Sequence, residues 1–160
     1  MATKKRPINT RPLVRLLFVV YIGFMLWLLF FNGRSSDAGL PYWEQVRANM
    51  NLTPLQTIRN YLHVLQHSQN KDLVQHCFIN LAGNVLLFIP TGLLLPRIWY
   101  RFRTFWKYLL CCVLSIALVE AVQLFSLRGS LDVDDLILNL SGMLLGYIAY
   151  RITHRKKKVK

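Results

Sequence analysis

The chain has 160 residues, of which 54% are hydrophobic, and it carries 20 Lys and Arg against 7 Asp and Glu. This length allows one compact unit and excludes two independent domains of ordinary size. A basic excess often indicates nucleic-acid binding, but the apolar residues gather in runs of about 20, the length that crosses a bilayer core. The composition therefore favours a membrane protein, and we expect no nucleic-acid partner.

The apolar runs predict four transmembrane helices, and hence an all-α four-helix transmembrane bundle. The predicted spans cover residues 13–31, 77–95, 105–125 and 136–152. Residues 1–12 then form a basic N-terminus, residues 13–152 a four-span module, and residues 153–160 a basic tail. The first run could also be a signal peptide, with a loose cleavage site at Ser36-Asp37-Ala38. Its apolar core is at the long end for a signal peptide, so we interpret it as a retained anchor.

The charges predict the orientation of the spans. Of the 20 basic residues, 15 fall in the N-terminus, the loop between the second and third spans, and the tail, or at the ends of the spans that adjoin them. All 7 acidic residues lie elsewhere. Because short loops rich in Lys and Arg stay in the cytoplasm, both termini are predicted to be cytoplasmic. The basic segments should also bind anionic headgroups, so we expect membrane lipids as partners.

The segment between the first two spans contains a second helical pattern. Leu55, Ile58, Leu62 and Leu65 recur at helical spacing and predict a short amphipathic helix from Pro54 to Gln66. Such a helix can lie on the outer membrane surface. It can equally pack over the mouth of the bundle, and the spacing does not separate these two alternatives.

Amide and carboxyl side chains occur within the spans only in the outer half of the membrane. Asn80 and Asn84 share one face of the second span, and Asp135 and Asn139 share one face of the fourth. Polar groups in a membrane usually face the bundle interior or a water-filled cavity. We therefore predict a site open to the outer leaflet. Its binding residues are Asn80, Asn84, Glu120, Gln123, Arg128, Asp132, Asp135 and Asn139.

A purely structural polar network is the alternative interpretation of these residues. Asn and Gln can bridge helices by hydrogen bonds worth about 1 kcal/mol or less each. Acidic residues in the first turn of the fourth span suit the helix dipole and can cap free N–H groups, which accounts for Asp134. Arg128 is expected to pair with Asp132 or Glu120, since pairing offsets the desolvation of both charges.

Small residues and proline also mark the second and fourth spans. Gly142 and Gly146 form a Gly-x-x-x-Gly pair, which permits close helix contact. Gly83 and Gly92 are interpreted as packing positions as well. Pro90 lacks a backbone N–H and should kink the second span.

Several short motifs occur in a fixed order along most of the chain. They are Asn51-Leu52-Thr53-Pro54-Leu55, Asn84-Val85-Leu86-Leu87-Phe88-Ile89-Pro90-Thr91-Gly92, Glu120-Ala121-Val122-Gln123, and the set Arg128, Asp132, Asp134, Asp135, Asn139 and Gly142. By their order and spacing, which cover about residues 51–151, the chain resembles the VanZ-like family of small bacterial membrane proteins. The resemblance implies a multi-pass protein of the bacterial cytoplasmic membrane. The family's namesake accompanies glycopeptide-resistance genes and is associated with reduced sensitivity to teicoplanin, so the resemblance also implies a cell-envelope role.

Two functional hypotheses follow. The first is a non-enzymatic factor that binds or shields an outer-leaflet component, such as a lipid-linked cell-wall precursor or the lipid anchor of teicoplanin. The second is an intramembrane enzyme in which Glu120 or Asp135 is the general acid or base. No nucleophile motif or metal-ligand set is present, so we assign no catalytic residue, metal or cofactor. A proton-coupled transporter is disfavoured because the inner half of the membrane lacks polar groups.

Overall fold

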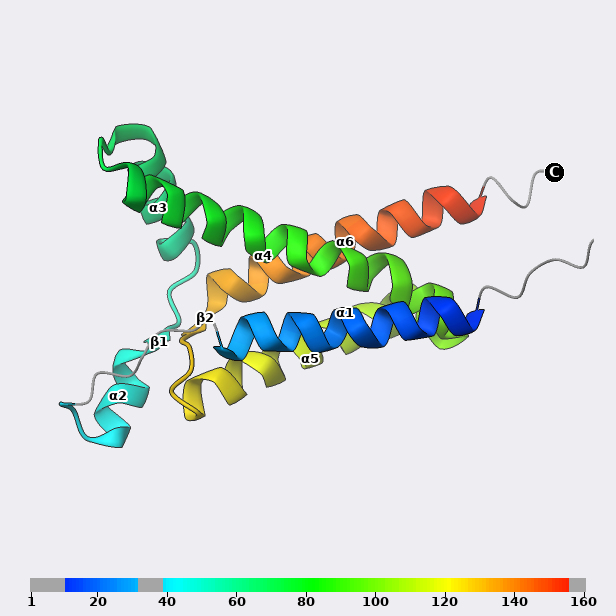
Figure 1. Cartoon of the computed structure of the whole chain (residues 1–160), viewed down its shortest axis with the longest axis horizontal. Coiled ribbons are helices and arrows are strands. Elements are labelled where there is room, and N and C mark those ends of the chain that lie inside the picture. Colours follow the sequence, from blue (N-terminus) through cyan, green and yellow to red (C-terminus); the bar gives the residue numbers. More distant parts are fainter. Residues whose placement is uncertain (1–10, 32–38, 156–160) are drawn as a thin grey trace, which may run out of the picture.

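The computed structural model describes residues 11–31 and 39–155 (Figure 1). The elements in chain order are α1 Arg11–Phe31, α2 Tyr42–Ala48, β1 Met50–Asn51, α3 Gln56–His67, α4 Lys71–Ile98, the 3-10 helix η1 Tyr100–Arg103, α5 Phe105–Phe125, β2 Leu131–Asp132 and α6 Val133–Arg155. The predicted all-α class is confirmed. Most of the predicted basic N-terminus, the considered cleavage site and the last five residues of the tail lie outside the described residues.

Among the described residues, four helices are long and apolar enough to cross a membrane, and they correspond to the four predicted spans. The observed bounds differ most from the predicted ones for α4, which begins at Lys71 and runs for 28 residues. Its early start has a local cause, because the side chain of Asn70 accepts the backbone N–H groups of Asp72 and Leu73 and caps the helix. The helix also continues through Pro90, whose missing N–H does not end it.

Helices α4 and α6 form the most extensive contact in the bundle, and glycines permit it. A Cβ atom on Gly142 would lie 2.1 Å from the carbonyl oxygen of Val85, and one on Gly92 or Gly146 would meet a backbone oxygen just as closely. The predicted packing role of these three glycines is confirmed. The same prediction for Gly83 is wrong, because a Cβ there would meet no atom within 4 Å.

The core lies between the four long helices, and buried hydroxyl groups connect them. Its buried members are Met25, Phe88, Tyr108, Cys112, Ile116, Met143, Tyr147 and Tyr150. The Tyr108 hydroxyl donates to the Met143 carbonyl oxygen at 2.7 Å and joins α5 to α6. Tyr21 and Thr91 share a 2.9 Å hydrogen bond between their hydroxyl groups and join α1 to α4. The hydroxyl groups of Tyr21, Thr91 and Tyr108 thus have partners on neighbouring helices within this apolar interior.

The remaining elements gather at one end of the bundle. Figure 1 shows α2 and α3 there, whereas α1 begins and α6 ends at the opposite end. Strands β1 and β2 pair in parallel with Asn51 opposite Asp132, a contact that the sequence analysis did not predict. A helix, α3, lies where the amphipathic helix was predicted, and it packs against α4 and contacts α6. It begins later than predicted, because Leu55 adopts a left-handed conformation with φ of 65° immediately before it.

Candidate functional site

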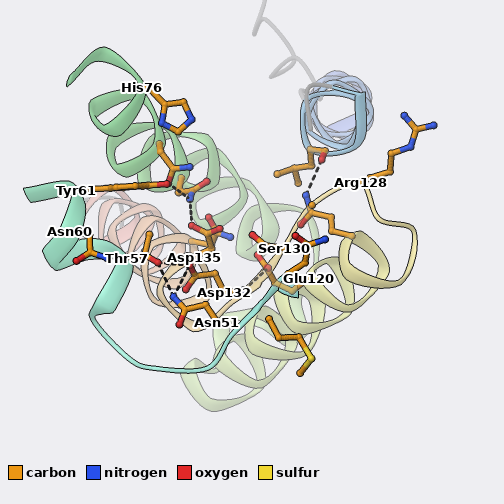
Figure 2. A pocket seen from close by; sticks show the side chains of 18 of the residues that line it. Asn51, Thr57, Asn60, Tyr61, His76, Glu120, Arg128, Ser130, Asp132 and Asp135 are labelled. Carbon is orange, nitrogen blue, oxygen red and sulfur yellow. Dashed lines mark hydrogen bonds between the residues drawn. The ribbon is translucent and has the colours of Figure 1, made fainter. Parts of the chain in front are cut away.

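A cavity of about 450 Å³ lies between the helices near α3 (Figure 2). All eight predicted binding residues line it, namely Asn80, Asn84, Glu120, Gln123, Arg128, Asp132, Asp135 and Asn139. They come from α4, α5, α6 and the loop around β2, and Leu28 and Leu29 of α1 also contribute to the wall. The four long helices therefore meet around one polar cavity.

One wall of the cavity is fixed by a hydrogen bond between α4 and α6. Nδ2 of Asn84 donates to Oδ1 of Asp135 at 2.6 Å, and it lies 3.5 Å from Oδ1 of Asn80. Hydrogen bonds to a carboxylate are shorter and stronger than those between neutral groups. The predicted structural network thus exists at this wall, and it holds the Asp135 carboxylate beside the cavity.

Asp132 connects three elements at the floor of the cavity. Its Oδ2 atom accepts hydrogen bonds from the Thr57 hydroxyl at 2.6 Å and from Nδ2 of Asn51 at 3.2 Å. Its Oδ1 atom accepts the backbone N–H of Asp134 at 2.8 Å and caps the start of α6, as predicted for this group of acidic residues. Both carboxylate oxygens of Asp132 are therefore engaged by the protein itself.

Asp134 lies behind the cavity and holds α3 in place. Its side chain is fully buried, and its two oxygens accept the backbone N–H groups of Leu55 at 2.5 Å and Ile58 at 3.0 Å. It therefore caps α3 from another part of the chain, in addition to its place in the first turn of α6. This contact gives the Asn51–Leu55 motif a physical role, since Asn51 bonds Asp132 and Leu55 presents its N–H to Asp134.

Glu120 is buried beside the cavity with little protein contact to its carboxylate. Its residue exposure is 5%, and within the described residues its side chain accepts one long hydrogen bond, from the backbone N–H of Asp132 at 3.5 Å. The predicted ion pair is wrong. In the part of the chain that the structure describes, Arg128 pairs with neither Asp132 nor Glu120, and Figure 2 shows its side chain pointing away from them.

Asn139 presents an unused hydrogen-bond acceptor. The residue is 3% exposed and lines the cavity, and its Oδ1 atom is buried without a hydrogen-bond partner among the described residues. Leaving a buried polar atom unpaired costs about 1–3 kcal/mol. Such an atom beside a cavity can accept a hydrogen bond from a ligand or from a water molecule that enters it.

Two further contacts frame the cavity. Nε2 of Gln123 donates to the carbonyl oxygen of Leu29 at 2.8 Å, so this predicted binding residue joins α5 to the end of α1. On the opposite side, the rings of Tyr61 and His76 meet edge to face with centroids 6.2 Å apart. Figure 2 shows both of these rings on the α3 and α4 side of the cavity.

Several residues that line the cavity were not predicted from the sequence. They are Asn51, Thr57, Asn60, Tyr61 and Ser130. Asn51 was visible as part of a motif, but nothing in the sequence placed that motif beside the fourth span. Thr57 and Tyr61 lie on the predicted amphipathic helix, whose polar positions gave no sign of facing a site.

The lining combines carboxylates and amides with hydroxyl groups, His76 and Arg128. Within residues 11–31 and 39–155, no group of three or more His, Cys, Asp or Glu side chains could hold a metal ion. The carboxylates of Glu120, Asp132 and Asp135 instead face a space large enough for a small polar headgroup.

Comparison with known proteins identifies the family. Residues 18–154, which include the cavity, match the sequence model of the VanZ/LLP1 family. The chain belongs to the VanZ/LLP1 family. It is 26% identical to protein VanZ of Enterococcus faecium over 148 residues, which cover 92% of this chain and 80% of that protein. No solved structure matches the chain. The VanZ/LLP1 match begins within α1 and ends within α6, so it includes most of the first candidate span and all of the other three.

Proposed function

We propose that this VanZ/LLP1 protein is a non-enzymatic factor of the bacterial cytoplasmic membrane. In this proposal the cavity binds the polar part of an outer-leaflet component, such as a lipid-linked cell-wall precursor or teicoplanin, and shields it. Binding lowers the sensitivity of the cell to teicoplanin, the antibiotic that the family resemblance implies.

The proposed orientation places the cavity at the outer face. Basic residues at the ends of the chain and in the loop after α4 favour a cytoplasmic position for these segments. The start of α1 and the end of α6 lie at one end of the bundle, opposite α3 (Figure 1). With four spans and both termini in the cytoplasm, α3 and the cavity face the outside.

The unpaired acceptor of Asn139 carries the binding proposal. A purely structural network would satisfy its own buried groups, as the hydrogen bonds of Asp132 and Asp134 do. Asn139 and Glu120 depart from this pattern, and both line the cavity. Their free acceptor capacity supports a site for a polar ligand.

The experiment compares antibiotic sensitivity with and without the gene. We expect a strain that expresses the protein to tolerate more teicoplanin than a matched strain without it, with little change for vancomycin, which has no lipid anchor. Equal teicoplanin sensitivity of the two strains, with the protein present in the membrane, would remove the resistance role.

Acid–base catalysis on an outer-leaflet lipid is the second candidate function. The observation that favours it is the buried Glu120 carboxylate beside the cavity, since a general acid or base must adjoin its substrate. Incubating the purified protein with lipid-linked cell-wall precursor distinguishes the two functions. A precursor recovered with unchanged mass supports binding, and a change that requires Glu120 supports catalysis.

A further inference from the structure

We infer that the cavity recognises a protonated primary amine, and that Glu120 and Asn139 are its acceptors. This inference rests on the proposed binding function and names the chemical class of its ligand. Amines of this class occur in aminolipid headgroups and as small soluble molecules.

The cavity offers hydrogen-bond acceptors that the protein itself does not use fully. Glu120 on α5 and Asn139 on α6 both line the cavity. The Oδ1 atom of Asn139 has no hydrogen-bond partner among the described residues, and Glu120 accepts one bond at 3.5 Å. A ligand that fills this space must therefore bring hydrogen-bond donors. A primary ammonium group brings three, as the side chain of Lys does.

The charge of the cavity lining favours a cation over an anion. Its lining includes the three carboxylates of Glu120, Asp132 and Asp135. Arg128 lies at the rim with an exposed side chain that points away from them (Figure 2). An anionic group such as a bare phosphate would meet like charges, which is unfavourable at short range in a low-dielectric interior. A cation is favoured for the same reason.

Charge and hydrogen-bond donors together favour a primary ammonium group over a neutral sugar or a quaternary amine. Buried charges are stabilised when they are both paired and hydrogen-bonded. A neutral sugar supplies donors but leaves the Glu120 carboxylate without a counter-ion. A trimethylammonium group supplies the charge but has no N–H for Oδ1 of Asn139. A primary ammonium satisfies both residues.

The apolar side of the cavity can contact the rest of the ligand. Leu28 and Leu29 of α1 line one side of the cavity, and the other walls are mostly polar. Leu28 and Leu29 belong to a helix whose residues are otherwise largely exposed and apolar. An aminolipid can place its ammonium group among the carboxylates and its acyl chains along this face.

The experiment uses the full-length protein in nanodiscs and counts retained lipids by native mass spectrometry. The nanodiscs contain equal parts of phosphatidylethanolamine, phosphatidylcholine and phosphatidylglycerol. We expect the wild-type protein to retain phosphatidylethanolamine over the other two. Glu120→Gln and Asn139→Leu should each lower that retention about tenfold, the factor expected when a hydrogen bond involving a charged group is lost.

Matched variants test the assignment to these two residues. Glu44→Gln removes a carboxylate that lies on exposed α2 away from the cavity, and it should retain phosphatidylethanolamine like the wild type. Gln75→Leu replaces an exposed amide of α4 that does not line the cavity, and as the control for Asn139→Leu it should also retain the lipid. Adding free ethanolamine distinguishes the source of the amine. Displacement of the lipid shows that a small amine suffices, and no displacement shows that the lipid is required.

Two outcomes would overturn the inference, and they differ from failure of the proposed function. Preferential retention of phosphatidylglycerol, or equal retention of phosphatidylcholine, would contradict amine recognition while leaving a binding function in place. Equal retention of every lipid by the wild type and by Glu120→Gln would remove both. The wild-type comparison requires no variant, so it stands even if a substitution prevents folding.

Discussion

Asn84 of α4 and Asp135 of α6 are joined by a 2.6 Å hydrogen bond at the wall of the cavity, although they are 51 residues apart in the sequence. The same two helices form the most extensive contact of the bundle. This contact places one carboxylate and one amide of the cavity at fixed positions. The packing of the helices and the geometry of the site therefore depend on each other.

Removing the Asn84 amide should loosen this wall. Asn84→Leu is close in size but leaves Oδ1 of Asp135 without this donor, which should lower the free energy of unfolding by about 1–3 kcal/mol. The measurement is denaturant unfolding of the purified protein in detergent micelles. Gln75→Leu, at an exposed position on the same helix, is the control and should change little. Equal effects of the two substitutions would contradict a specific role for the Asn84–Asp135 bond.

The glycines of the α4–α6 contact should not tolerate even one added methyl group. In Gly142→Ala the new Cβ would lie 2.1 Å from the backbone oxygen of Val85, so the helices must separate. Overpacking of this kind typically costs about 1–3 kcal/mol. Gly83→Ala is the matched control on α4, because its Cβ would meet open space and Ala favours helix by about 1 kcal/mol. The thermal midpoint should fall in the first variant only, and a fall in both would contradict the account.

Asp134 should control the position of α3 rather than the stability of the spans. Asp134→Asn replaces one acceptor oxygen with a donor that faces a backbone N–H of Leu55 or Ile58. We expect faster amide hydrogen exchange across residues 55–67, with exchange in α4 and α6 unchanged. Asp72→Asn, an exposed carboxylate in the first turn of α4, is the control. Unchanged exchange in α3 would show that Asp134 does not cap it.

The proposed orientation has its own test. A reporter fused after Lys160 should behave as cytoplasmic, and one inserted after Ser68, between α3 and α4, should be exposed outside the cell. The opposite pattern would place the cavity at the cytoplasmic face. It would also remove any contact with an outer-leaflet component.

The spans were predictable because each is a long apolar run with a local signal. The set of eight cavity residues was also predictable, since polar groups at equal depth in neighbouring spans must share an interior. Short elements without periodicity were not predictable from the sequence. Strands β1 and β2 have two residues each and pair across 80 residues of chain, so neither carries a pattern that could reveal its partner.

The directions of individual side chains could not be predicted from the sequence either. Arg128 was assigned to a carboxylate because it is near Asp132 along the chain, yet its side chain points away from Asp132 and Glu120 (Figure 2). Asp134 was attributed to the dipole of α6, and it instead also caps α3 through two backbone N–H groups. Both outcomes depend on how the loop between α5 and α6 folds, which spacing alone does not determine.

The most direct test of the central claim measures teicoplanin tolerance in strains that carry cavity variants at matched protein levels. The account predicts that Glu120→Gln and Asn139→Leu abolish the tolerance conferred by the wild-type protein, whereas Glu44→Gln preserves it. Full tolerance in both cavity variants would contradict the claim that this cavity is the functional site.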